Sequence, residues 1–205
     1  MIGIVDYKSN NINAVYRQVK LFTNQVKIVS TSKDLADVSK IILPGVGHFG
    51  AAVASLKNTG LFETLKEQVT INQTPILGIC LGMQLLGNHS TESPATEGIG
   101  LLNGTTIKLS AEPGNHHLKV PHIGWNSIVV QQNSVLLKNI TSEMFFFFSH
   151  SYTYTPTLSS AIVATTNYGQ EMATVVAYQH IFGVQFHPEK SRAAGAIIIQ
   201  NFITL

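Results

Sequence analysis

The chain has 205 residues, of which 44% are hydrophobic and 12% are charged, and its formal net charge is +2. This length and apolar content predict a single globular domain over residues 1–205, and the lack of a basic run argues against nucleic-acid binding. A single cysteine excludes an intramolecular disulfide, which fits a reducing compartment such as the cytoplasm. No signal-peptide pattern opens the chain, and no apolar stretch approaches the roughly 20 residues of a membrane span.

The first part of the chain alternates between strand-like apolar segments and amphipathic helical segments. The pattern predicts strands at residues 2–5, 26–29, 41–43 and 75–79, and helices at residues 11–22, 50–58, 61–71 and 82–86. Strands that alternate with helices in this way are typical of a parallel sheet covered on both faces. In such sheets the functional groups gather at the carboxyl ends of the strands.

After about residue 98 the pattern changes to short strands separated by turn residues. These strands are expected at residues 105–109, 127–130, 144–148, 161–166, 172–177 and 181–185, before a final helix over 192–199. The phenylalanine-rich strand at 144–148 is expected to belong to the core. The predicted fold class is therefore α/β, with a mostly parallel central sheet flanked by helices and an additional antiparallel portion in the C-terminal half.

The only cysteine, Cys80, lies between two glycines in Gly78-Ile79-Cys80-Leu81-Gly82, where a predicted strand meets a predicted helix. This spacing is typical of a nucleophile elbow, a strained turn that holds the nucleophile above the edge of the sheet. The N–H groups at the start of the following helix can bind a developing oxyanion. The alternative is that Cys80 is a small buried hydrophobic residue, as many free cysteines are.

A cysteine nucleophile needs a base, and His187 is the best placed of the eight histidines. It follows the predicted strand at 181–185, and Pro188 ends that strand. Glu189 lies two residues beyond His187, so in an extended chain both side chains lie on one side and the carboxylate can orient the imidazole. The alternative is a histidine at a strand end beside a solvated glutamate.

Acyl transfer also needs hydrogen-bond donors for an oxyanion. The segment Pro44-Gly45-Val46-Gly47 follows a predicted strand, and its two glycines allow backbone N–H groups to turn toward a substrate carbonyl. The N–H of Leu81, just after the cysteine, is the natural second donor. The alternative is an ordinary strand-to-helix turn; the lysine and the Ser or Thr of a phosphate-binding P-loop are missing.

Taken together, these segments resemble the class I glutamine amidotransferase family, and within it the glutaminase subunits of imidazole glycerol phosphate synthase. The matching segments are PGVGHF at 44–49, GICLGMQLL at 78–86, PHIGWN at 121–126, SHSY at 149–152 and FHPEKS at 186–191. They follow the family's order and span the chain. The segment at 121–126 is the most specific, because other class I amidotransferases generally lack it.

The resemblance implies a role for each matching position. Cys80 would attack the carboxamide of glutamine to form a γ-glutamyl thioester, His187 would carry the proton to the departing ammonia, and Glu189 would orient His187. The implied oxyanion donors are Val46, Gly47 and Leu81. The implied glutamine pocket is lined by Gly47, Gln84, His150, Ser151 and Tyr152.

The resemblance also implies a partner. Ammonia would pass to a (β/α)8-barrel cyclase subunit, in a heterodimer that makes imidazole glycerol phosphate and aminoimidazole carboxamide ribotide in histidine biosynthesis. The low charged content agrees with a lasting partner. The positions that the family places at or near the interface are matched by Asn11, Trp125, Asn126 and Lys190, although tryptophan is equally common in cores.

No cofactor and no metal are expected, because the spacing of the remaining histidines, including His116 and His117, does not suggest a metal site. The first loop departs from the family pattern, with Lys8 and Asn10 where glycines are usual. Lysine is disfavoured in left-handed backbone, whereas asparagine tolerates it. The triad chemistry does not depend on this loop.

Three alternatives remain at this point. The chain could belong to another class I amidotransferase, of the anthranilate or aminodeoxychorismate synthase type, although residues 121–126 argue against it. It could be a non-catalytic partner subunit on the same fold, although the intact Cys80, His187 and Glu189 argue against that. A cysteine peptidase on a related fold is the third.

Overall fold

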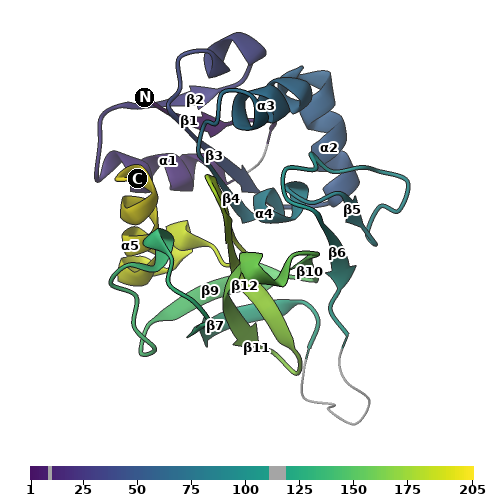
Figure 1. Ribbon diagram of the computed structural model, residues 1–205, viewed down its shortest axis with the longest axis vertical. Coiled ribbons are helices and arrows are strands. Elements are labelled where there is room, and N and C mark those ends of the chain that lie inside the picture. The colour runs from purple at the N-terminus through teal and green to yellow at the C-terminus, as the bar shows by residue number, and fades with distance from the viewer. Residues whose placement is uncertain (9–10, 111–118) are drawn as a thin grey trace.

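An eight-stranded sheet runs through the molecule in a computed structural model that describes residues 1–8, 11–110 and 119–205 (Figure 1). The strand order is β2-β1-β3-β4-β13-β12-β11-β8. The first five strands in this order are parallel: β2 (Val26–Val29), β1 (Ile2–Val5), β3 (Lys40–Gly45), β4 (Ile76–Cys80) and β13 (Ile181–Val184). The last three continue antiparallel: β12 (Glu171–Tyr178), β11 (Ile162–Asn167) and β8 (Val129–Val130).

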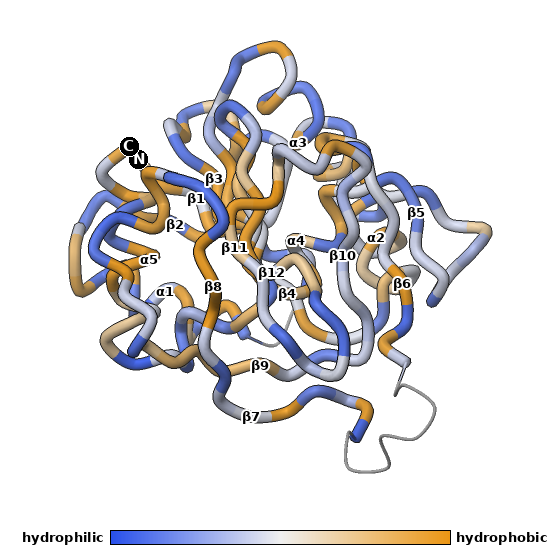
Figure 2. Tube along the Cα trace, turned by 60° about the horizontal axis from the view of Figure 1, so that its bottom comes forward, coloured by the Kyte–Doolittle hydropathy of each residue, from blue (hydrophilic) through white to orange (hydrophobic). Residues whose placement is uncertain are grey.

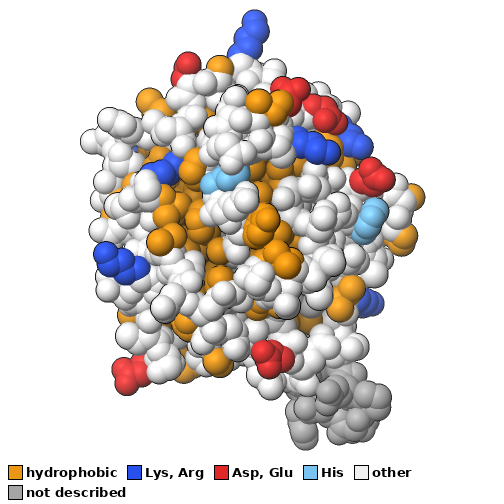
Figure 3. All heavy atoms as spheres, in the orientation of Figure 1, with side chains coloured by type: hydrophobic (Ala, Val, Ile, Leu, Met, Phe, Trp, Pro, Cys, Tyr) orange, Lys and Arg blue, Asp and Glu red, His pale blue; other side chains and the backbone are white. Residues whose placement is uncertain are grey.

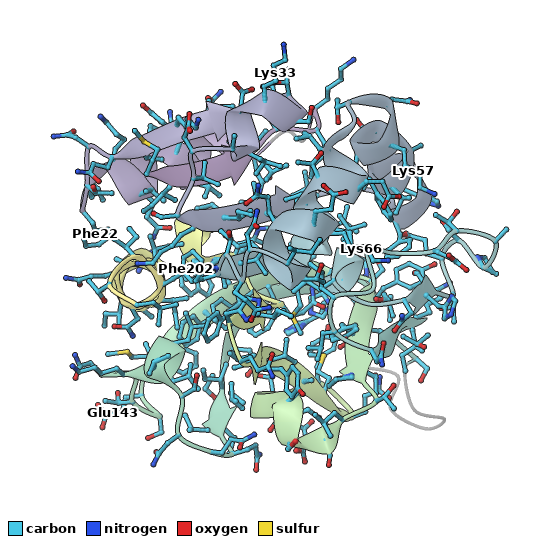
Figure 4. The ribbon with its side chains drawn as sticks, turned by 45° about the horizontal axis from the view of Figure 1, so that its top comes forward. Phe22, Lys33, Lys57, Lys66, Glu143 and Phe202 are labelled. Atoms are coloured by element: carbon cyan, nitrogen blue, oxygen red, sulfur yellow. The ribbon has the colours of Figure 1, made fainter. Side chains whose placement is uncertain are left out.

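Helices cover both faces of the parallel part of the sheet (Figure 1). Helices α1 (Ile12–Lys20) and α5 (Arg192–Ile203) contribute to one hydrophobic cluster, and Figure 4 shows Phe202 on the inner side of α5. Helices α2 (Phe49–Asn58) and α3 (Leu61–Thr70), with the short α4 (Leu81–Leu85), contribute to the other cluster. Four short 3₁₀ turns complete the helical part: η1 (Ser32–Leu35), η2 (Val135–Leu137), η3 (Ser159–Ala161) and η4 (Pro188–Lys190).

The parallel strands are apolar along their length because they are buried on both faces. In β3, Ile41 and Leu43 face the cluster of α2 and α3, whereas Ile42 between them faces the cluster of α1 and α5. All three side chains are fully buried. Figure 2 shows these hydrophobic strand segments inside the molecule, and Figure 3 shows charged side chains mostly around the rim of one face.

The predicted antiparallel portion is confirmed in the C-terminal half. Beyond β11 and β12, it contains a ribbon of β7 (His122–Ser127) and β9 (Phe145–His150), and β10 (Tyr152–Pro156) paired with β6 (Gly104–Lys108). The two-residue strand β5 (His89–Ser90) adds to β6 in parallel. The sequence pattern did not predict β5, β10 or most of β7, because these segments lack a continuous apolar run. The strand expected at 127–130 corresponds to the last residue of β7 and to β8.

One sequence-based expectation is wrong for part of the phenylalanine run. Phe146 and Phe148 are fully buried, but Phe145 is 54% exposed. Successive side chains of a strand point to opposite faces, and only one face of β9 packs against the core. Composition alone hides this alternation, because every position in the run is aromatic.

The first loop has the backbone that its sequence disfavours. Lys8 has a φ of 72°, and its N–H donates to Asp6 Oδ1 at 2.7 Å. A lysine therefore occupies the left-handed conformation that glycine adopts without strain.

Asn10, His116 and His117 lie outside the described residues. None of the helices in the described ranges has the length and apolar character needed to cross a membrane.

Candidate active site

The sheet order places three predicted site segments side by side. Strand β4, which ends at Cys80, lies between β3 and β13. Gly45 at the end of β3 is paired with Cys80, and Val184 at the end of β13 is paired with Ile79. The segments that follow these strands therefore leave the same sheet edge on either side of the cysteine. Parallel pairing alone joins the glycine-rich loop, the cysteine and the histidine.

Cys80 occupies a strained elbow between β4 and α4. It has φ 54° and ψ −108°, and its side chain is 5% exposed. The flanking glycines are required by close backbone approach: a Cβ on Gly82 would lie 1.8 Å from the carbonyl oxygen of Leu43, and one on Gly78 would lie 2.7 Å from that of Gly82. A strained backbone such as that of Cys80, with its positive φ, persists only where the surrounding packing holds it in place. The predicted elbow geometry is thus present at Cys80.

His187 and Glu189 form a buried hydrogen-bonded pair. His187 Nδ1 and Glu189 Oε1 are 2.8 Å apart, and the side chains are 1% and 0% exposed. Asn11 Nδ2 donates to the same carboxylate oxygen at 3.1 Å. Because Nδ1 is engaged by Glu189, Nε2 is the ring nitrogen left for Cys80, whose interaction with His187 raises the pKa of the imidazole.

The backbone reason for this pair differs from the predicted one. His187 has extended backbone, but Pro188 starts a 3₁₀ turn, η4, that carries Glu189. The turn, rather than two extended residues, brings the carboxylate to the imidazole. The alternative of a solvated glutamate is not found, because the Glu189 side chain has no exposed surface.

The pair favours an ionised state. Burial disfavours the imidazolium, but the charge and hydrogen bond of Cys80, together with those of Glu189, outweigh it and raise the pKa of His187 to about 10. Burial likewise opposes ionisation of Glu189, yet the hydrogen bond and charge of His187 hold the pKa of that carboxyl below its usual range. A positive imidazolium held by a buried carboxylate and placed next to a cysteine suits nucleophilic catalysis by that cysteine.

A cavity of about 300 Å³ opens in front of Cys80. All the residues predicted for the oxyanion donors and the glutamine pocket line it: Val46, Gly47, Leu81, Gln84, His150, Ser151 and Tyr152. Gly47 has φ 103° and nothing within 4 Å of the position of a Cβ, so the loop that carries it has space to turn. The candidate nucleophile Cys80, the base His187 and backbone N–H groups that could donate hydrogen bonds therefore all lie at one cavity.

Two neutral histidines stand beside this cavity. Burial lowers the pKa of His150 to about 3 and that of His122 to about 4. His150 Nδ1 donates to the carbonyl oxygen of Tyr152 at 2.9 Å, so its Nε2 accepts from His122 Nδ1 at 3.1 Å. His122 in turn stacks on Tyr168 and Phe148. His122, from the PHIGWN segment, thus fixes the ring of a pocket residue.

The sequence reasoning missed three residues of this site. Gln185 Nε2 donates to Cys80 Sγ at 3.7 Å, and Asn11, predicted only for a partner interface, bonds Glu189. Glu92 lines the cavity, and its carboxylate accepts from the N–H of Phe49 at the start of α2 at 2.7 Å. No spacing signals these contacts, because each joins segments more than 40 positions apart.

Of the other residues predicted for the interface, Lys190 lies at the cavity, whereas Trp125 and Asn126 lie on β7 and do not line it. Trp125 is 45% exposed, with Arg192 5.1 Å above its ring, and Lys190 lines the cavity while its ammonium lies 5.6 Å from the ring of Phe147. Asn126 Nδ2 donates to the carbonyl oxygen of Asn167 at 3.1 Å. Their role at an interface stays a prediction.

Among residues 1–8, 11–110 and 119–205, no three His, Cys, Asp or Glu side chains are grouped as metal ligands would be.

Comparison with known proteins identifies the class of this fold and site. The model of the family "Glutamine amidotransferase class-I" matches residues 3–205, so the chain belongs to the class I glutamine amidotransferase family. The fold agrees with a crystal structure of a glutamine amidotransferase (TM-score 0.77, 15% identity) and with PurLQS from Thermotoga maritima (TM-score 0.76, 20% identity). Each match covers 99% of this chain and 97% of the chain in the solved structure.

Within that family the chain is similar to one group of subunits. It is 40% identical over 205 residues to the imidazole glycerol phosphate synthase subunit HisH of Methanocaldococcus jannaschii. It is 38% identical over 205 residues to HisH 1 of Campylobacter jejuni, and 36% identical over 207 residues to HisH 1 of Methanococcus maripaludis. Each alignment covers the whole of both chains, and the predicted family resemblance is confirmed.

Proposed function

We propose that this chain, acting as one domain over residues 1–205, hydrolyses glutamine to glutamate and ammonia and supplies the ammonia to a cyclase subunit of imidazole glycerol phosphate synthase. The observation that carries the proposal is the constellation of Cys80, His187 and Glu189 at one cavity. Full-length similarity to HisH subunits supports the pathway. A biosynthetic role and one reduced cysteine both fit the cytoplasm.

The thiolate of Cys80 attacks the carboxamide carbon of glutamine, and the carbonyl oxygen becomes an oxyanion. The N–H of Leu81, at the start of α4, and an N–H of Val46 or Gly47 after a turn of that loop bind this oxyanion. The imidazolium of His187 gives its proton to the leaving ammonia, and a γ-glutamyl thioester remains. Neutral His187 then takes a proton from water, which attacks the thioester and releases glutamate and the thiolate.

The cavity also fits the charged end of an amino acid. Glu92 places a carboxylate on the wall, where it attracts an α-ammonium group, and Lys190 places a cation there. The amide of Gln84 and the backbone of residues 150–152 form the polar part of the same wall. We assign glutamine binding to Gly47, Gln84, His150, Ser151 and Tyr152, with Glu92 added.

The partner in this proposal is a (β/α)8-barrel cyclase subunit, bound as a heterodimer. Exposed Trp125, the neighbouring Asn126 and Lys190 at the cavity offer the aromatic and polar groups typical of an interface. Asn11 would then connect this surface to the triad through Glu189. Ammonia released at Cys80 would leave the cavity on the side that the cyclase covers.

The substitution Cys80→Ala tests the chemistry. We expect glutamate release, assayed with the cyclase subunit present, to fall by at least about 1,000-fold, because the thioester cannot form. The variant should fold normally, since the substitution removes only one atom from a small side chain, and circular dichroism and thermal unfolding check this. Normal glutamate release by the folded variant would refute the assignment.

A further inference from the structure

We propose that Gln185 is a positioning residue that holds an amide donor on the sulfur of Cys80 and so sets the pH at which this cysteine becomes reactive. Gln185 follows β13 and precedes Phe186 and His187. Its side chain is fully buried, and its Nε2 donates to Cys80 Sγ at 3.7 Å. The proposal about reactivity stands on this contact, and only its consequence for catalysis rests on the proposed glutaminase function.

A second contact fixes which end of the amide faces the sulfur. Gln84 Nε2 donates to the carbonyl oxygen of Tyr152 at 2.9 Å, and a carbonyl only accepts, so this atom of Gln84 is a nitrogen. The same nitrogen donates to Gln185 Oε1 at 3.2 Å. The NH₂ group of Gln185 must therefore point to Cys80. Its backbone N–H bonds the carbonyl oxygen of Thr174 at 2.8 Å, which anchors the residue on β12.

The surroundings of the sulfur make this donor important. His187 is the titratable group that interacts with Cys80, and the sulfur also has a polar contact with the carbonyl oxygen of Ser149, 4.0 Å away. A carbonyl can accept from a thiol, but it repels a thiolate. The Gln185 amide does the opposite, because a donor bonds a charged acceptor more strongly than a neutral one. Gln185 thus opposes Ser149 and favours the charged nucleophile.

The chain Gln84–Gln185–Cys80 also links the cavity wall to the nucleophile. Gln84 lines the cavity and holds Gln185 by its oxygen, so the position of Gln185 depends on a residue that faces substrate. In the thioester the sulfur is neutral and the bond weakens, and it strengthens again when the thiolate leaves. We therefore expect Gln185 to act in both half-reactions.

The test measures alkylation of Cys80 by iodoacetamide against pH in the full chain. Cys80 is the only cysteine, so the reaction reports one site. In Gln185→Met, which has similar length but no donor, the pH midpoint of alkylation should rise by about one unit. A more basic thiolate is also more nucleophilic. Alkylation should therefore be about fourfold slower well below the midpoint and about 2.5-fold faster above it.

Two further variants keep the test decisive. Gln185→Asn retains a buried amide but withdraws it from the sulfur, and it should move the midpoint in the same direction. Thr174→Val is the matched control: Thr174 is equally buried and bonds the carbonyl oxygen of Ala164, so its loss should lower stability without moving the midpoint. Thermal unfolding of each variant separates folding effects from reactivity.

The outcomes are distinct. A raised midpoint with crossing rate profiles in the Gln185 variants supports the proposal, even if the wild-type chain with its cyclase releases no glutamate, in which case only the proposed function fails. Unmoved midpoints in Gln185→Met and Gln185→Asn would overturn it and leave Gln185 a structural residue. An equal shift in Thr174→Val would overturn it as well.

Discussion

Glu189 does not contact the sulfur, but it holds the histidine that we propose as the acid and base. Its side chain is fully buried, bonds His187 Nδ1 at 2.8 Å and accepts a second hydrogen bond from Asn11. We predict that Glu189→Gln lowers kcat for glutamine hydrolysis by about 100-fold or more, because a neutral amide neither stabilises the imidazolium nor fixes its tautomer. Its effect on KM should be small, since Glu189 does not line the cavity. Steady-state kinetics with the cyclase present measures both.

A matched control uses an exposed glutamate. Glu67→Gln on α3 removes the same charge at the surface and should leave kcat within about twofold of wild type. Equal losses in the two variants would mean that net charge, and not the contact with His187, explains the effect.

The raised pKa of His187 also predicts how stability depends on pH. In the folded chain the pKa is about 10, against an ordinary value of 6.5 for histidine, so the folded state keeps a proton that the unfolded state has lost. The stabilisation is complete below about pH 6.5 and disappears as pH rises through about 10. Because the proposed thiolate of Cys80 has lost a proton that an unfolded cysteine keeps up to about pH 8.5, the free energy of unfolding in urea should fall mainly in the upper part of this window, between about pH 8.5 and 10.

The same measurement on Glu189→Gln isolates the cause. This variant lacks one of the groups that raise the pKa of His187, so its free energy of unfolding should fall less over the window. If wild type and variant lose the same amount, the His187–Glu189 pair does not control the titration.

At the scale of elements, the turn from β4 to α4 depends on a glycine that has no room for a methyl group. A Cβ on Gly82 would lie 1.8 Å from the carbonyl oxygen of Leu43 in β3, so α4 and β3 would have to separate. We predict that Gly82→Ala lowers the free energy of unfolding by about 3 kcal/mol or more, because the clash is with backbone. Chemical denaturation gives the value.

Gly60→Ala is the contrasting variant. Gly60 has φ 72° but nothing within 4 Å of a Cβ, so only the left-handed backbone is penalised, by about 1 kcal/mol. A larger loss in Gly60→Ala than in Gly82→Ala would mean that backbone conformation, rather than close approach, determines where this chain needs glycine.

The elements near Cys80 were predictable because their signals are local. The glycines around Cys80 and the step from apolar strand to helix lie within a few residues, and so do His187 and Glu189. The sequence pattern missed the 3₁₀ turn at Pro188, and it missed the alternation that exposes Phe145. In both places the local composition fits more than one backbone.

At the scale of the whole molecule, the site depends on contacts that no local pattern contains. Asn11 bonds Glu189 across 178 positions, Gln185 bonds Cys80 across 105, and Glu92 reaches α2 across 43. Their partners are determined by the strand order β3-β4-β13 and by the helices packed on it. Family resemblance supplied the pocket residues, but the fold was needed to connect Gln185 and Glu92 to the chemistry.

The loop at Val46 and Gly47 is the basis for predicting that activity depends on the proposed partner. Gly47 has a positive φ, is exposed and has nothing within 4 Å of the position of a Cβ, so close packing around this position does not prevent the loop from turning. If the isolated chain holds the oxyanion-binding form only as a minor state, a partner that favours this form raises activity in proportion. Low activity alone is therefore expected from the structure of this loop.

The most direct measurement is glutamate release from glutamine by the chain alone, and by the chain with its cyclase subunit and the cyclase's ribotide ligand. We predict low release by the chain alone and stimulation of at least about tenfold in the complex. Release that ignores the cyclase would contradict the assigned partner and pathway. No release under any condition, from folded protein, would contradict the glutaminase itself.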